Sequence, residues 1–179
     1  MTDFLYSIDV YIFYAINHGL NNPAFTKFFS IITDVNNWYI TYVILLGILF
    51  FNGGKRGKFA AIMILLLIVA VDQTCARILK EYFARPRPCN VLGDVITPLG
   101  CNGTFSFPSN HAANNFAAAM FFFRLYPNLK WVLFIIAALI AFSRVYLGLH
   151  YPSDIIGGAL IGIGFGYVFA LVQTKVLKA

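Results

Sequence analysis

The stretch from Ile155 to Val172 reads IIGGALIGIGFGYVFALV and contains no charged side chain. A helix needs roughly 20 mostly apolar residues to cross the hydrocarbon core of a bilayer, or about 17 at the short end. Further apolar runs include Phe59–Val71, Phe116–Phe123 and Trp131–Phe142, each within a segment of about that length. These runs predict an all-α fold built from membrane-spanning helices.

The overall composition also indicates a membrane protein. Of the 179 residues, 60% are hydrophobic and 11% are charged, whereas about 25% are charged in soluble domains. So few charges could not cover the surface of a water-soluble protein of this size. The net charge of +6 would favour a nucleic-acid partner only if the basic residues formed a water-facing patch. They cluster instead at the ends of apolar runs, so we expect no nucleic-acid partner.

We predict a single domain, residues 1–179, organised as an integral-membrane bundle of about six transmembrane helices. The expected spans lie near residues 4–19, 38–52, 58–83, 110–126, 130–149 and 153–175. A short amphipathic helix from Pro23 to Asp34 is expected to rest in the interface. The first span contains Asp9 and several tyrosines, so it could instead lie flat on the membrane.

Lysine and arginine in short loops predict the orientation, because they favour the cytoplasmic side of a membrane. With six spans, the basic loop residues fall on one side: Lys55, Arg56, Lys58, Arg124, Lys130, Lys175 and Lys178. The N-terminus is expected on that side too. The opposite, outer side receives the 84–108 loop and the short 150–153 connection. Cys89 and Cys101 lie in the long loop, where they could form a disulfide or stay free.

Three polar clusters map to the outer ends of the expected spans. They read KEYFARPRP (80–88), FPSNH (107–111) and SRVYLGLHYPSD (143–154). Any one of their basic residues or histidines could simply be an interfacial side chain. Their joint occurrence at one level of the membrane is what indicates a functional site.

Together the three clusters suit phosphoryl transfer, which needs mainly positioning and charge stabilisation. His150 and Asp154 pair an imidazole with a carboxylate, which fixes the histidine tautomer and raises its nucleophilicity. His111 supplies a second imidazole that can protonate a leaving oxygen. The expected phosphate-binding residues offer positive charge or an open helix N-terminus: Lys80, Arg87, Ser109, Asn110 and Arg144.

In order and spacing, these residues resemble the three-part signature of the type 2 phosphatidic acid phosphatase superfamily. That superfamily also includes bacterial class A acid phosphatases and vanadium haloperoxidases. The parts are Lys-x6-Arg-Pro from Lys80, Pro-Ser-x-His ending at His111, and Ser-Arg-x5-His-x3-Asp from Ser143; the resemblance covers about residues 65–166. Asn110 departs from the family pattern, which has glycine at this position.

The resemblance implies that His150 forms a phosphohistidine, that Asp154 orients it, and that His111 acts as general acid and then as base. It implies a metal-independent hydrolase without a cofactor, and no acidic cluster in the sequence suits a two-metal site. With the loop charges, it predicts a multi-pass protein of the bacterial inner membrane whose site faces the periplasm.

The expected partners are membrane lipids and a lipid phosphate substrate. The candidate substrates are lipid A 1-phosphate, undecaprenyl pyrophosphate, phosphatidylglycerol phosphate and phosphatidic acid. Two alternatives stay open. A lipid-to-lipid phosphotransferase would use the same residues, whereas a non-catalytic transporter of lipids or anions would tolerate the loss of His150.

Overall fold

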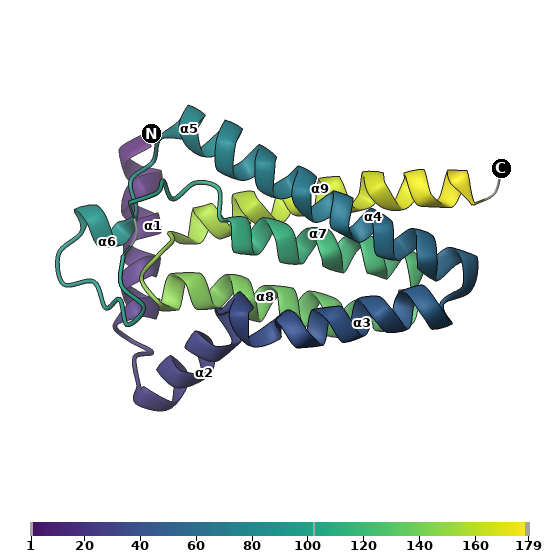
Figure 1. Ribbon diagram of the computed structural model, residues 1–179. Helices are drawn as coiled ribbons and strands as arrows, with labels where there is room; N and C mark the ends of the chain where they lie inside the picture. Colours follow the sequence, from purple (N-terminus) through teal and green to yellow (C-terminus); the bar gives the residue numbers. More distant parts are fainter. Residues whose placement is uncertain (1, 102, 178–179) are drawn as a thin grey trace.

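The computed structural model describes residues 2–101 and 103–177, and every regular element among them is helical. In Figure 1 the helices of the bundle lie side by side, while α1 and α2 gather at one end of it. The α-helices are α1 (Thr2–Asn17), α2 (Pro23–Thr33), α3 (Tyr39–Asn52), α4 (Gly54–Gln73), α5 (Lys80–Phe83), α6 (Pro88–Val91), α7 (Asn110–Leu125), α8 (Lys130–Tyr146) and α9 (Pro152–Val176). The 3₁₀-helices are η1 (Val35–Trp38) and η3 (Pro127–Leu129), and η2 (Thr74–Leu79) is a π-helix that joins α4 to α5.

Within the described residues, four helical segments are long and apolar enough to cross a membrane. They are Val35–Asn52, Gly54–Val91, Pro127–Tyr146 and Pro152–Val176. The 16-residue α7 runs alongside them and is about 24 Å long (Figure 1). The predicted all-helical membrane bundle is confirmed.

The first expected span, residues 4–19, does not run with the bundle. α1 lies across the end of the bundle, against α8 and α9 (Figure 1). Asp9, Phe13 and Asn17 recur every fourth residue and form its buried face. Its exposed side chains are largely apolar: Phe4, Leu5, Ile8, Tyr11 and Ile12.

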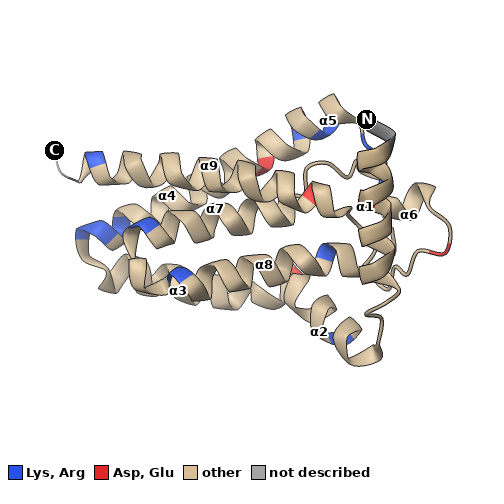
Figure 2. Ribbon diagram, turned by 180° about the vertical axis from the view of Figure 1, so that it is seen from behind, with Lys and Arg blue, Asp and Glu red and all other residues tan. Residues whose placement is uncertain are grey.

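A helix with this amphipathic pattern suits the interface better than the hydrocarbon core. α1 lies at the site end of the bundle, not at the end that carries the basic loops (Figures 1 and 2). The prediction that the N-terminus lies with the basic loops is therefore wrong.

Basic residues gather at the end of the bundle opposite α1 (Figure 2). The start of α4, the last turn of α7, the start of α8 and the last turn of α9 lie at this end. They carry Lys55, Arg56, Lys58, Arg124, Lys130 and Lys175. Lys178, which was predicted with them, lies outside the described residues. The predicted common location of these basic segments is thus confirmed.

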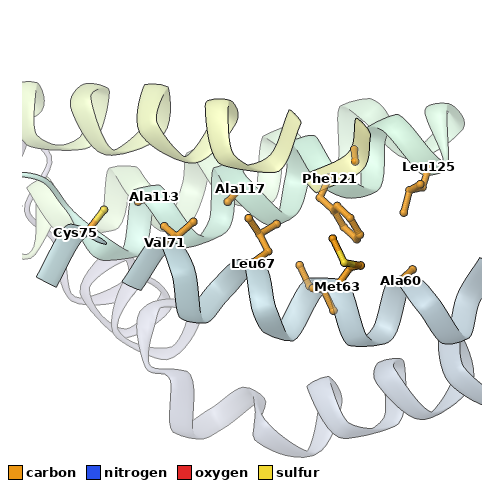
Figure 3. Packing of buried hydrophobic residues seen from close by; sticks show 11 residues of the cluster. Ala60, Met63, Leu67, Val71, Cys75, Ala113, Ala117, Phe121 and Leu125 are labelled. Atoms are coloured by element: carbon orange, nitrogen blue, oxygen red, sulfur yellow. The ribbon is translucent and has the colours of Figure 1, made fainter. Parts of the chain in front are cut away.

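The packing of α4, α7 and α9 brings the signature residues to one end of the bundle. Apolar side chains of α4 recur every three or four residues and face α7 (Figure 3). α7 and α9 approach closely because Gly158, Gly162 and Gly166 face α7. A Cβ on Gly162 would collide with the carbonyl oxygen of Ala113. This contact aligns the N-terminal ends of α7 and α9.

Candidate active site

A cavity of about 380 Å³ lies at the end of the bundle where the three polar clusters meet. It is lined by Ala76, Lys80, Glu81, Arg87, Gly103, Thr104, Phe105, Asn110, His111, Arg144 and His150. Most of the predicted site residues are therefore brought together around one space. The exceptions are Ser109 and Asp154, which are fully buried and do not line it.

His150 lies in the short link between α8 and α9 and is 2% exposed. Its backbone N–H donates to the carbonyl oxygen of Arg144 at 3.2 Å. The link turns at Gly148, where φ is +77° and a Cβ would lie 2.6 Å from the carbonyl oxygen of Ile96. Only glycine fits such a position without strain. The turn therefore ends α8 at Tyr146, earlier than the predicted residue 149, and fixes the backbone of His150.

Both ring nitrogens of His150 have a defined neighbour. Nε2 lies 3.1 Å from a terminal nitrogen of Arg87, and because arginine can only donate, Nε2 must accept. The ring proton therefore sits on Nδ1, which lies 3.4 Å from Oδ2 of Asp154. Burial lowers the pKa of His150 to about 4, so the ring is neutral at neutral pH. The Nε2 lone pair is thus the candidate nucleophile.

Asp154 is fully buried in the first turn of α9. Its Oδ2 accepts from the backbone N–H of Tyr151 at 2.8 Å, and its Oδ1 accepts from Arg85 at 2.7 Å. Its carbonyl oxygen accepts from the N–H of Ser109 at 3.1 Å, which joins the starts of α7 and α9. These contacts hold the carboxylate in place beside His150.

Arg85 is a residue that the sequence analysis missed as part of the site. It donates to Asp154 and Ser153 at 2.7 Å and to Asp9 at 2.6 Å. Its guanidinium carbon lies 4.0 Å from the ring centroid of Tyr151. The sequence does contain an indication of its role. Arg85 lies in the loop that is predicted on the outer side, whereas basic loop residues favour the cytoplasmic side.

Thr33, at the end of α2, is a second missed residue. Its carbonyl oxygen lies 3.3 Å from Nε2 of His111, and its hydroxyl accepts from Arg144 at 3.0 Å. Nε of Arg144 is buried and has no hydrogen-bond partner among the described residues. α2 thus holds both residues beside the cavity, and Arg144 keeps a donor for an anion. Nothing in the sequence pattern places α2 there.

The 84–108 loop orients the other two cations. Lys80 donates to the carbonyl oxygen of Phe105 at 2.7 Å. Arg87 donates to the carbonyl oxygen of Thr104 at 2.9 Å and to its hydroxyl at 2.8 Å. Cys89 and Cys101 form a disulfide within this loop, with a Cα–Cα distance of 6.0 Å. Of the two options left open by the sequence, the structure has the disulfide.

The start of α7 differs from what the phosphate-binding prediction implied. Ser109 caps the helix and accepts from the N–H of Ala112. Asn110 is already helical, so the glycine of the family pattern is not needed for its backbone angles. Its side-chain amide donates to Asp72 at 2.7 Å. Asn110 still borders the cavity, whereas the Ser109 side chain is occupied by capping.

No group of three or more His, Cys, Asp or Glu side chains that could hold a metal occurs within residues 2–101 and 103–177. The cations around the cavity are protein side chains, and they face the two histidines. Such a site can bind a multiply charged oxyanion and carry out nucleophilic attack and proton transfer on it.

Comparisons with known proteins identify the family of this chain. The family model described as the PAP2 superfamily matches residues 61–178. Lipid A 4'-phosphatase of Bacteroides thetaiotaomicron is 34% identical, over 98% of this chain and 81% of the relative. The protein of the same name from Porphyromonas gingivalis is 29% identical, over 92% of this chain and 72% of the relative.

Among solved structures, the crystal structure of a transmembrane PAP2-type phosphatidylglycerolphosphate phosphatase from Bacillus subtilis is similar to this chain. The TM-score is 0.74 and the sequence identity is 26%, with 96% of this chain and 87% of that chain covered.

Proposed function

Because this chain belongs to the PAP2 superfamily and is a multi-pass membrane lipid phosphatase, we propose that it cleaves its substrate through a phosphohistidine on His150. The observation that carries this proposal is the Arg87 contact to Nε2. It leaves the proton on Nδ1, beside Asp154, and keeps Nε2 unprotonated at the edge of a cavity lined by cations.

In the proposed reaction, Nε2 of His150 attacks phosphorus and the bond from phosphorus to the lipid oxygen breaks. His111, in its protonated form, gives a proton to that leaving oxygen. Water then attacks the phosphohistidine, His111 takes a proton from it, and the phosphorus–nitrogen bond breaks to release inorganic phosphate. Lys80, Arg87 and Arg144 balance the charge of the non-bridging oxygens in both steps.

We propose a phosphorylated glycolipid of the lipid A type as the substrate. Two relatives named lipid A 4'-phosphatase match nearly the whole chain, which supports this choice. The cavity of about 380 Å³ has room for a phosphate and the adjoining part of a headgroup. Acyl chains would remain in the bilayer, against the exposed apolar side chains of the bundle.

The test is a panel of substrates presented to the purified enzyme. The panel contains lipid A, with the loss of the 1- and 4'-phosphates followed separately, undecaprenyl pyrophosphate, phosphatidylglycerol phosphate and phosphatidic acid. We expect lipid A to have the highest kcat/KM. Released phosphate should account for all substrate lost; a shortfall matched by a phosphorylated acceptor lipid would show phosphotransfer instead.

The same experiment tests the nucleophile. His150→Ala should abolish phosphate release and the acid-labile label that ³²P-substrate leaves on the wild-type protein, and vanadate should inhibit the wild type. Full phosphatase activity in the folded variant would overturn the mechanism. A chelator should leave activity unchanged, and a strict need for magnesium would contradict the metal-independent chemistry.

We propose that the site faces the periplasm across the bacterial inner membrane. The basic segments at the opposite end support this, since they favour the cytoplasm, and so does the disulfide, since disulfides persist in oxidising compartments. A cysteine introduced at Gly93, in the exposed loop, should react with a membrane-impermeant maleimide on intact spheroplasts. One introduced at Asn128, in the α7–α8 link, should react only after lysis. The reverse pattern would contradict the orientation.

A further inference from the structure

The buried acid of α1 is fully engaged at the start of α9. Asp9 is 7% exposed. Its Oδ1 accepts from the backbone N–H of Ser153 at 2.9 Å. Its Oδ2 accepts from the Ser153 hydroxyl and from Arg85 at 2.6 Å. Burying an unpaired carboxylate destabilises a folded protein. Each carboxylate oxygen of Asp9 instead accepts from a donor.

Arg85 continues the connection toward the reacting histidine. One terminal nitrogen binds Asp9 and the other binds Oδ1 of Asp154 at 2.7 Å. The other carboxylate oxygen of Asp154 lies 3.4 Å from Nδ1 of His150. Arg85 does not line the cavity. It is therefore placed to act on His150 through Asp154, and not on a bound phosphate.

We propose that Asp9 and Arg85 are positioning residues for the reaction at His150, and that the transverse helix α1 thereby belongs to the catalytic apparatus. This inference rests on the proposed function, in which His150 is the nucleophile. It assigns a role to a residue outside the three-part signature, Asp9, which is separated from Arg85 by 76 positions in the sequence.

The physical reason lies in the charge of Asp154. Without Arg85 the buried carboxylate loses its charged partner and keeps the N–H of Tyr151 and the neutral ring of His150 as its neighbours. A buried unpaired charge is costly, so the carboxylate would turn or take up a proton. In either case Asp154 no longer holds the proton on Nδ1 of His150. The proton then occupies Nε2 in a fraction of the molecules, and in those molecules Nε2 cannot attack phosphorus.

Aromatic contacts dock α1 in the same place. The ring of Phe13 lies 5.9 Å from that of Tyr151, and the hydroxyl of Tyr6 lies 3.3 Å from the hydroxyl of Tyr151. These contacts would remain when Asp9 is replaced. The charge of Asp9 can therefore be removed while α1 stays docked, which separates positioning from a purely structural role.

The experiment compares Arg85→Gln, Asp9→Asn and the double variant with the wild type, in the full chain reconstituted in proteoliposomes. Arg85→Gln should lower kcat on the order of 100-fold and Asp9→Asn about 10-fold, the range expected when hydrogen bonds between charged groups are lost. KM and the inhibition constant of inorganic phosphate should change by less than about 2-fold, because neither residue touches the cavity.

Two further variants sharpen the assignment. Asp9→Glu keeps the charge and should recover most of the activity that Asp9→Asn loses. In the double variant, Asp9→Asn should add almost nothing to Arg85→Gln, because both act along one connection. The charge-matched controls, Asp94→Asn in the exposed loop and Arg124→Gln at the far end of the bundle, should keep wild-type kcat.

The outcomes separate this inference from the proposed function. If His150→Ala is inactive and the wild type forms a phosphohistidine, but Asp9→Asn has wild-type kcat, the positioning role is wrong and the function stands. A rise in KM with unchanged kcat, or fully additive effects, would also overturn it. Should Arg85→Gln fail to fold, Asp9→Asn carries the test, because Arg85 retains its bonds to Asp154 and Ser153 there.

Discussion

The α8–α9 link and the start of α7 each bring a histidine to the same cavity, but they hold it differently. His150 is almost fully buried, with a neighbour at each ring nitrogen and a backbone fixed by the turn at Gly148. His111 is only partly buried. The structure gives its ring one hydrogen-bond contact, at 3.3 Å to the carbonyl oxygen of Thr33.

The difference matches the two tasks in the proposed reaction. A nucleophile must present one lone pair in one direction, so a fixed ring lowers the entropic cost of attack. A general acid that later acts as a base must serve first a leaving oxygen and then a water molecule. The site thus fixes the proposed nucleophile and holds the proposed proton-transfer group more loosely.

The largest expected effect comes from loosening the fixed histidine through Asp154→Asn. An amide would offer a donor to Nδ1 of His150, which favours the wrong tautomer, and the loss in kcat should be on the order of 10³- to 10⁴-fold. Steady-state kinetics with the lipid substrate measure it, with Asp94→Asn as the control. A loss below about 10-fold would mean that Asp154 does not set the tautomer.

A smaller and conditional effect is expected for His111→Ala. With a natural lipid, whose leaving alkoxide needs a proton, kcat should fall by about 10²- to 10⁴-fold. With a nitrophenyl phosphate ester the leaving group departs without a proton, so phosphohistidine formation should be close to the wild-type rate. The rate of nitrophenol release in the first turnover is the measurement.

His150→Ala is the matched control for that experiment. It should lose activity with both substrates, because an ester with a better leaving group still needs a nucleophile to attack phosphorus. If the nitrophenyl ester fails to rescue His111→Ala, the histidine has a role in binding or folding and is not the general acid.

The sequence predicted the parts of this site that depend on helical order and spacing. The long helices arise from apolar runs, and the signature residues stand at the ends of those runs, so packing the helices side by side brings His111, Arg144 and His150 together. The two histidines, the three cations and Asp154 could all be named on that basis. Their distances could not.

What the sequence did not reveal depends on contacts between distant segments. Arg85 meets Asp154 across 69 positions, and Thr33 meets Arg144 across 111. No periodicity records how α1 and α2 lie against the bundle end, because an amphipathic helix can either cross or dock. In the sequence, Asp9 made α1 a poor candidate for a membrane-spanning helix. Only the structure shows the role of this charge, which is to pair with Arg85.

The more loosely held side of the site can be disturbed separately with Thr33→Val. Valine keeps the carbonyl oxygen that faces His111 and removes the hydroxyl that accepts from Arg144. The freed guanidinium should hold the phosphate less well, so we expect KM to rise about 10-fold with little change in kcat. Thr174→Val, at the far end of α9, is the control. A fall in kcat at unchanged KM would place Thr33 in the proton-transfer step instead.

The smallest expected effect is the response of His150 to mild acid. Burial disfavours the charged ring and lowers the pKa of His150 to about 4, so the imidazole stays neutral as the pH falls from 8 to 5 and gains its proton only below that. Nuclear magnetic resonance of ¹⁵N-histidine in detergent micelles should show a titration midpoint near 4, against about 6.5 for histidine in the unfolded chain. His150→Ala assigns the signal. A midpoint between 6 and 7 would mean that the ring is solvated, and the contrast between a fixed and a loosely held histidine would then be lost.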